Sequence, residues 1–153
     1  GDYDLVQKTL TEKNNFKLDF WKIAMRPGKP LFFGLLSNIP FLGLPGNPVS
    51  TGVCSIIFLR AIINYFLKQL IKSDIVYIPV GVDLEQNDLR EDYLRSKFST
   101  TLSGKQSVIP FKKQDSSQLN LFSKAECLII RRSNAKKCKK GTLVPVLKLP
   151  QFI

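Results

Sequence analysis

Apolar and polar residues in the first third of the chain follow a pattern that predicts strands. Apolar and charged residues alternate over 16–20, which indicates a strand with one buried face. Two apolar runs follow, 31–36 and 39–44, and Ser37-Asn38 between them is typical of a hairpin turn. Since Pro40 has no N–H to donate, the second run should lie at an edge or be only partly paired.

The longest regular pattern is helical and begins at Pro48. From there to about Leu70, apolar residues recur at helical spacing. The length and hydrophobicity approach those of a membrane span. Arg60, Asn64 and Lys68 are spaced four apart and form one polar stripe. This stripe favours a long helix packed against a sheet.

The pattern changes at residues 72–74, and the rest of the chain shows short alternating runs separated by Gly and Pro. We expect strands over 75–82, 92–102, 107–111, 127–131 and 142–149. Five or six short strands with little helix predict a small β-barrel or sandwich. The sequence therefore predicts an α/β region followed by an all-β region, with domains at 1–72 and 73–153.

Composition limits the chemistry that this chain can perform. Its 153 residues carry a net charge of +11 and contain no histidine. A Ser-His-Asp or Cys-His catalytic group and a His-ligated metal site are therefore excluded for this chain. The positive charge suits an anionic partner, and nucleic acid, a membrane surface and a phosphorylated cofactor all fit that description.

The three cysteines show no CxxC spacing, which argues against a disulfide framework or a zinc site. A reducing cytoplasm is the expected location. Cys54 falls on the apolar helix and should be a core residue. The chain opens on acidic residues without an initiator methionine, and we expect it to be part of a larger protein.

Two bends rich in Pro and Gly carry the candidate chemistry. In the first, Arg26 and Lys29 bracket a Pro-Gly turn, and Lys22 lies just upstream. Lysine and arginine at fixed positions can surround a tetrahedral oxyanion without proton transfer. The alternative is that these are ordinary solvated charges.

The second bend is Pro45-Gly46-Asn47-Pro48, followed by Ser50. Asn47 is a good N-cap, and Pro48 suits the first helical position. Free N–H groups at a helix start favour anions, so we hypothesise one oxyanion or phosphate pocket built from both bends. The alternative is a turn that leads into an ordinary helix cap.

Together the two bends carry a family resemblance. Lys-Ile-Ala-Met-Arg-Pro-Gly-Lys-Pro at 22–30 and Gly-Leu-Pro-Gly-Asn-Pro-Val-Ser at 43–50 resemble the motifs of molybdopterin molybdenumtransferases (MoeA and the E domain of gephyrin). Gly1-Asp2-Tyr3-Asp4 resembles the segment that precedes them. The resemblance implies the C-terminal portion of such a protein. It would comprise the C-terminal half of a partial doubly wound, MogA-like α/β domain that binds molybdopterin, followed by a C-terminal β-barrel.

The resemblance also implies roles for individual residues. Its catalytic residues would be Asp2, Lys22, Arg26 and Lys29, and its substrate-binding residues would be Pro30, Pro45, Gly46, Asn47, Pro48, Ser50, Arg95 and Ser117. Leu121 stands where the family commonly has a serine, so that contact would be lost or moved to Ser117 or Asn120.

Asp2 could simply cap a short helix that runs to about Leu10. The family places an acidic residue here near a metal-dependent site, which makes Asp2 a candidate ligand of Mg2+, with Asp4 a weaker one. The principal acidic motif of the family is absent from this chain.

The implied reaction inserts molybdenum from molybdate into adenylylated molybdopterin and releases AMP. The family resemblance implies a cytoplasmic homodimer, and we expect this chain to be inactive alone and to bind neither nucleic acid nor membrane. One alternative is a non-catalytic scaffold of the gephyrin type. Another is a basic nucleic-acid-binding module, with Lys136-Lys137-Cys138-Lys139-Lys140 as its densest basic run. That run lacks the interleaved aromatic residues of a stacking platform.

Overall fold

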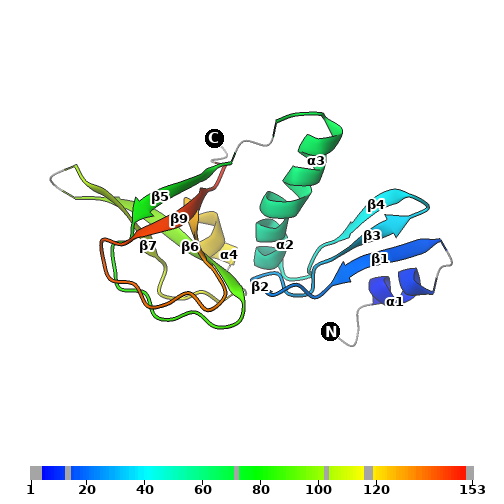
Figure 1. The fold of residues 1–153 in the computed structure, drawn as a ribbon, viewed down its shortest axis with the longest axis horizontal. Helices are drawn as coiled ribbons and strands as arrows, with labels where there is room; N and C mark the ends of the chain where they lie inside the picture. The colour runs from blue at the N-terminus through cyan, green and yellow to red at the C-terminus, as the bar shows by residue number, and fades with distance from the viewer. Residues whose placement is uncertain (1–4, 13–14, 71–72, 102–103, 116–118, 151–153) are drawn as a thin grey trace.

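Two sheets lie on either side of one long helix (Figure 1). The computed structural model describes residues 5–12, 15–70, 73–101, 104–115 and 119–150. A short helix, α1 (Leu5–Thr11), packs beside the first sheet, near the N-terminus (Figure 1).

The first sheet is three-stranded and antiparallel, and its strands cover the three runs that the hydrophobic pattern predicts to be strands. Its strands, in the order β1-β3-β4, are β1 (Phe16–Trp21), β3 (Phe32–Leu36) and β4 (Ile39–Gly43). Ser37 and Asn38 both adopt the left-handed conformation, with φ of 50° and 66°, as a two-residue hairpin turn requires. Pro40 lies in β4 at the edge of the sheet. The predicted hairpin and edge position are confirmed.

The second sheet has the order β2-β6-β8-β9-β5, and β7 also pairs with β6. Its strands are β2 (Met25–Arg26), β5 (Ile75–Pro79), β6 (Glu91–Thr100), β7 (Gln106–Pro110), β8 (Cys127–Arg131) and β9 (Leu143–Lys148). All five strands expected after residue 74 are present, with bounds that shift by a few residues. Within the stretch expected to be a polar loop, α4 (Leu119–Ser123) forms a short helix.

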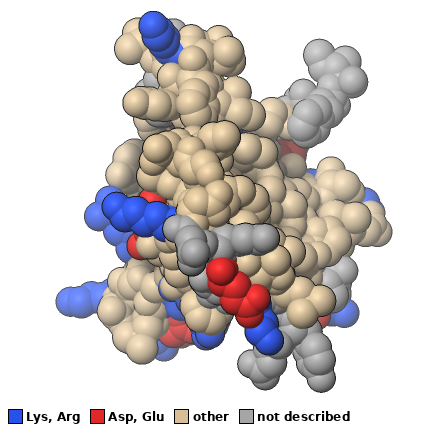
Figure 2. Space-filling model, turned by 90° about the vertical axis from the view of Figure 1, so that its right-hand side faces the viewer, with Lys and Arg blue, Asp and Glu red and all other residues tan. Residues whose placement is uncertain are grey.

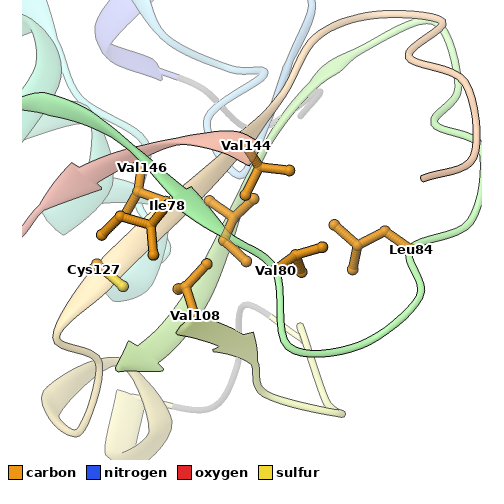
Figure 3. Close-up of a cluster of buried hydrophobic side chains, with 8 residues drawn as sticks. Ile78, Val80, Leu84, Val108, Cys127, Val144 and Val146 are labelled. Atoms are coloured by element: carbon orange, nitrogen blue, oxygen red, sulfur yellow. The ribbon is translucent and has the colours of Figure 1, made fainter. Parts of the chain in front are cut away.

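The prediction of a closed β-barrel was wrong, because the described part of the second sheet stays open. β5 and β7 approach each other at a single bridge between Val80 and Val108, where the Gly81 N–H donates to the Val108 carbonyl at 2.8 Å. β5 is paired with β9 up to Pro79, whose nitrogen has no hydrogen to donate to a further ladder. A buried cluster that includes Ile78, Val80, Val108 and Val146 fills the curve of the sheet (Figure 3).

The partial doubly wound α/β domain is also not confirmed. Such a sheet needs parallel strands joined by crossover helices, whereas β1, β3 and β4 are antiparallel neighbours. Among the described residues, the parallel strand pair is β2 with β6. The architecture is a mostly β fold with few helices.

One continuous helix separates the two sheets (Figure 1). It consists of α2 (Pro48–Cys54), a π-helical segment η1 (Ser55–Leu59) and α3 (Arg60–Phe66). It ends before the predicted Leu70 because Lys68 turns to φ 52°, and the N–H groups of Lys68 and Gln69 then donate to Tyr65 and Asn64. These two bonds are those of a Schellman cap.

The helix has a buried beginning and an exposed end. Val49, Val53 and Cys54 are fully buried, as expected for a core helix and as predicted for Cys54. Tyr65 and Phe66 are exposed. By length and composition, this helix is one that could cross a membrane.

β2 joins the two parts of the chain. Met25 pairs with Glu91 and Arg26 with Asp92, and the Glu91 N–H donates to the Ala24 carbonyl at 2.9 Å. Residues from both parts share an apolar cluster around this point, formed by Met25, Leu31, Val53, Cys54 and Leu128. The domain boundary near residue 72 remains a prediction. The pairing of β2 with β6 connects the parts of the chain on either side of it.

Gly28 allows the first bend to pack closely against α2. Its φ is 127°, and a Cβ there would lie 2.8 Å from Cys54 Sγ and 2.9 Å from Met25 Sδ. Gly28→Ala should therefore lower the free energy of unfolding by about 3 kcal/mol, since backbone strain adds to overpacking. Urea denaturation of the variant measures this loss.

Gly141→Ala is the matched control, because Gly141 also has a positive φ, of 89°, but has open space around it. It should cost about 1 kcal/mol from strain alone. Equal losses in the two variants would contradict a tight contact between the first bend and α2.

Candidate functional site

Arg26 lies at the junction of the two sheets, and two carboxylates hold its guanidinium group. One nitrogen donates to Asp88 Oδ2 at 3.1 Å, and the other contacts Asp92 Oδ2. Asp92 is buried, whereas the side chains of Arg26 and Asp88 are about half exposed. The hydrogen bond with Asp92 raises the pKa of Arg26. The first bend therefore presents a permanently charged group that is already paired.

Arg26 and Arg95 line the same hollow. We call it the arginine hollow; its volume is about 390 Å³, and it is lined by Arg26, Pro27, Asp92, Tyr93, Leu94, Arg95 and Gln114. Arg95 belongs to β6, and the pairing of β2 with β6 brings this strand beside the first bend. Asp92, the partner of Arg26, and Arg95 are three positions apart on β6, so their side chains lie on opposite faces of the sheet.

The guanidinium group of Arg95 is buried without a hydrogen-bond partner among the described residues. Arg95 is only 1% exposed, and none of its three side-chain nitrogens finds an acceptor there. Burial lowers the pKa of Arg95, and the charge of Asp115 acts in the opposite direction. Burying such a group without acceptors is costly. An oxyanion that reached this side chain would supply them, since guanidinium binds oxyanions through paired N–H groups.

Gln114 fixes the backbone at Arg95. Its side-chain oxygen accepts from the Arg95 N–H at 2.9 Å, and its side-chain nitrogen donates to the Arg95 carbonyl at 3.0 Å. The same nitrogen donates to the Phe111 carbonyl at 2.8 Å. Gln114 therefore acts on β6 as a neighbouring strand would, and it holds Arg95 in place beside the hollow.

Lys22 and Lys29 face a different hollow. This lysine hollow has a volume of about 420 Å³ and is lined by Lys22, Ile23, Ala24, Lys29, Asp88, Leu89 and Arg90. Lys22 has a left-handed backbone, with φ of 62°, and its Nζ lies 4.0 Å from the centre of the Trp21 ring, a cation–π contact. The basic trio predicted to converge is thus divided between two hollows, with Arg26 in one and both lysines in the other.

The second bend caps a helix. The Ser50 N–H donates to Asn47 Oδ1 at 3.1 Å, the Ser50 hydroxyl donates to the same oxygen at 3.2 Å, and Pro48 occupies the first turn. The Thr51 hydroxyl donates to the carbonyls of Pro45 and Asn47. The prediction that Asn47 is an N-cap is confirmed.

The predicted residues of the second bend do not reach the two basic hollows. Neither hollow is lined by Pro45, Gly46, Asn47, Pro48 or Ser50, nor by Pro30 of the first bend. Pro45 and Ser50 are buried, while Gly46, Pro48 and Pro30 are exposed. The structure therefore does not place both bends around one common hollow.

The remaining predicted residues are Asp2, Asp4 and Ser117, which lie outside the described residues. Asn120 and Leu121 lie in α4, the first exposed and the second half-buried. Within the described ranges, no group of three His, Cys, Asp or Glu side chains could hold a metal ion. Mg2+ and its ligand Asp2 remain predictions.

Sequence reasoning missed Asp88, Arg90 and Gln114 as site residues. Asp88 and Arg90 come directly before β6, in a charged stretch that ends at Asp92. That stretch was a usable signal, because charges next to a motif arginine often pair with other charges of the site. Gln114 begins the stretch Gln114-Asp115-Ser116-Ser117, which resembles a Gln-x-Ser loop of the family. Its support of β6 was not predicted, since that role depends on a contact with a residue nineteen positions away.

The basic run 136–140 lies on loops where acidic partners meet it. Lys137 pairs with Glu85 at 2.8 Å, and Lys139 pairs with Asp83 at 2.9 Å. On the face of the molecule shown in Figure 2, lysines and arginines are scattered at the margin around a largely uncharged surface. Two of the four lysines of this run are therefore paired with acidic side chains.

Known proteins match the chain along most of its length. Residues 77–149 match the family described as the MoeA C-terminal region (domain IV). The molybdopterin molybdenumtransferase of Haemophilus influenzae is 30% identical over 148 residues, which are 95% of this chain and 36% of that protein. The chain belongs to the MoeA family.

Two further comparisons give matches that are consistent with this assignment. The molybdenum cofactor synthesis protein cinnamon of Drosophila melanogaster is 37% identical over 65 residues, which are 42% of this chain and 11% of that protein. The structure of a MoeA protein from Pyrococcus horikoshii superposes with a TM-score of 0.77 at 19% identity, over 97% of this chain and 36% of that one. This MoeA-family chain thus spans about a third of the length of its relative from Haemophilus influenzae.

Asn47 allows a test of whether the second bend is a cap or a ligand site. Asn47→Ala should lower the free energy of unfolding by about 1 kcal/mol, because the Ser50 N–H loses its acceptor. Asn47→Asp keeps the acceptor and should retain the stability. If the bend only caps the helix, neither variant changes the dissociation constant for molybdate in calorimetric titration. Loss of binding in Asn47→Asp, with stability retained, would instead identify the bend as a ligand site.

Proposed function

We propose that this MoeA-family chain provides the oxyanion-binding part of a molybdopterin molybdenumtransferase. The whole protein would insert molybdenum from molybdate into adenylylated molybdopterin and release AMP. The name of the Haemophilus influenzae relative supports this reaction class. The single observation that carries the proposal is the buried guanidinium of Arg95, which has no acceptor among the described residues.

The two hollows suit two anionic substrates. Molybdate is a tetrahedral dianion, and a guanidinium group offers it paired N–H donors in fixed directions. The lysine hollow, with Lys22, Lys29 and Arg90, suits the phosphate groups of the nucleotide-linked pterin. Arg26 lines the arginine hollow and Asp88 lines the lysine hollow, so the ion pair between them links the two.

Catalysis under this proposal needs no nucleophilic side chain. The chain would orient two anions next to each other and neutralise their charges as they meet, which lowers the barrier through proximity and electrostatic stabilisation. Arg26, Arg95, Lys22 and Lys29 would perform this role. Contacts from Pro30, Ser50 and Ser117, an Mg2+ ion at Asp2, a homodimer and a cytoplasmic location are further proposals that rest on the family resemblance.

Arg95→Lys tests the oxyanion site. Lysine keeps the charge but removes the planar fork of donors, so molybdate binding measured by isothermal titration calorimetry should weaken about tenfold. Arg60→Lys is the matched control, because Arg60 pairs with Asp74 and lies outside both hollows. It should leave binding unchanged. Since Arg95 is buried, circular dichroism must show that the variant remains folded.

Substitution of the exposed residues Arg26 and Lys29 is a second test of the proposed function. In the full-length protein, Lys29→Ala should abolish cofactor formation while the melting temperature stays close to that of the wild type. Arg26→Ala should abolish it as well, and it should also lower the melting temperature because buried Asp92 loses its partner. Normal cofactor formation in both variants, or unchanged molybdate affinity in a folded Arg95→Lys chain, would contradict the proposed function.

A further inference from the structure

We infer that Asp88 is a positioning residue that competes with a bound oxyanion for the guanidinium group of Arg26, and so sets the anion affinity of the arginine hollow. The inference rests on the proposed function and adds to it a residue that tunes the site. Asp88 itself does not line the arginine hollow and acts through Arg26.

The carboxylate of Asp88 lies between two guanidinium groups. Its Oδ2 is 3.1 Å from a nitrogen of Arg26 and 3.8 Å from a nitrogen of Arg90. Its Oδ1 accepts from the backbone N–H of Arg90 at 2.9 Å. That hydrogen bond, together with the charges of both arginines, lowers the pKa of Asp88. Asp88 therefore carries a full negative charge at neutral pH, where it partners Arg26 as an incoming oxyanion would.

Asp88 and Asp92 hold Arg26 in different ways. Asp92 is 5% exposed and lines the arginine hollow, so it forms a fixed anchor for one nitrogen of Arg26. The side chain of Asp88 is 51% exposed and binds the other nitrogen. Ion pairs that are exposed to water are weak, so the contact with Asp88 is the one that an anion can displace.

Two carboxylates oppose the charge of Arg26. Asp92 and Asp88 both pair with its guanidinium group, and Asp88 is shared with Arg90. An oxyanion that approaches Arg26 therefore meets two negative charges beside it. Removal of the Asp88 charge leaves only that of Asp92, which should strengthen anion binding.

The backbone around Asp88 is held independently of Arg26. The Asn134 N–H donates to the Asp88 carbonyl at 2.7 Å. The side chain of Asn87 donates to the carbonyls of Arg90, Arg131 and Arg132 at 2.7–3.0 Å. A change confined to the carboxylate should therefore leave this loop in place, which makes Asp88 suitable for substitution.

Asp88→Asn separates charge from structure, because asparagine keeps the oxygen that accepts from the Arg90 N–H. Calorimetric titration of the chain with sodium molybdate should give a dissociation constant about threefold lower than that of the wild type, as expected for the loss of an exposed competing charge. Asp88→Ala should tighten binding to a similar extent.

Asp83→Asn is the matched control. Asp83 is 53% exposed, pairs with Lys139 at 2.9 Å and accepts from the Lys140 N–H at 2.8 Å, so its contacts resemble those of Asp88. It lies outside the arginine hollow. The variant gains the same net charge, and its molybdate affinity should change by less than about 1.5-fold, since a distant exposed charge is screened.

Each outcome of the titration decides the inference. Tighter molybdate binding in Asp88→Asn than in Asp83→Asn supports competition for Arg26. The comparison of these two variants holds even if the wild type binds molybdate too weakly to measure. Equal changes in both variants, or weaker binding in Asp88→Ala with no change in Asp88→Asn, would overturn it. If no chain binds molybdate, the proposed function fails together with the inference. Wild-type binding with an unaltered Asp88→Asn affinity removes the inference alone.

Discussion

The pairing of β2 with β6 is the contact on which the candidate site depends. β2 is only two residues long, so its backbone bonds alone would be weak. The buried cluster around Met25 and the ion pair between Arg26 and Asp92 hold it against β6. This pairing places the first bend beside the strand that carries Asp92 and Arg95. Without it, Arg26 would have no reason to line a hollow together with residues of β6.

The same contact explains why the site contains unsatisfied groups. One oxygen of Asp92 and all three side-chain nitrogens of Arg95 are buried without partners among the described residues. A protein selected only for stability would pair or expose such groups. A bound oxyanion would supply acceptors for the Arg95 nitrogens, whereas the Asp92 oxygen needs a donor that an oxyanion does not have.

Local patterns in the sequence were sufficient for much of the fold. The Ser37-Asn38 hairpin, the cap at Asn47 and the strand at 127–131 all follow from short-range signals, and the structure has them. Barrel closure could not be predicted in this way, because it depends on whether β5 and β7 form a ladder. For similar reasons the division of the basic trio was not visible: Arg26 is paired with carboxylates 62 and 66 residues away in the chain.

The family resemblance nominated Arg95 as a site residue, and the structure shows that its side chain is buried. These two kinds of information are complementary, since a motif nominates a residue and the fold determines its neighbours. Gln114 illustrates the difference, because it lies in a stretch that the resemblance identifies, while its contacts show that it supports β6.

A crystal structure of the chain soaked in sodium tungstate would test the central claim most directly, since tungsten is located by its anomalous scattering. We predict one strong anomalous peak in the arginine hollow, within hydrogen-bonding reach of both Arg26 and Arg95. A peak at the start of α2 beside Ser50, with the arginine hollow empty, would contradict the account.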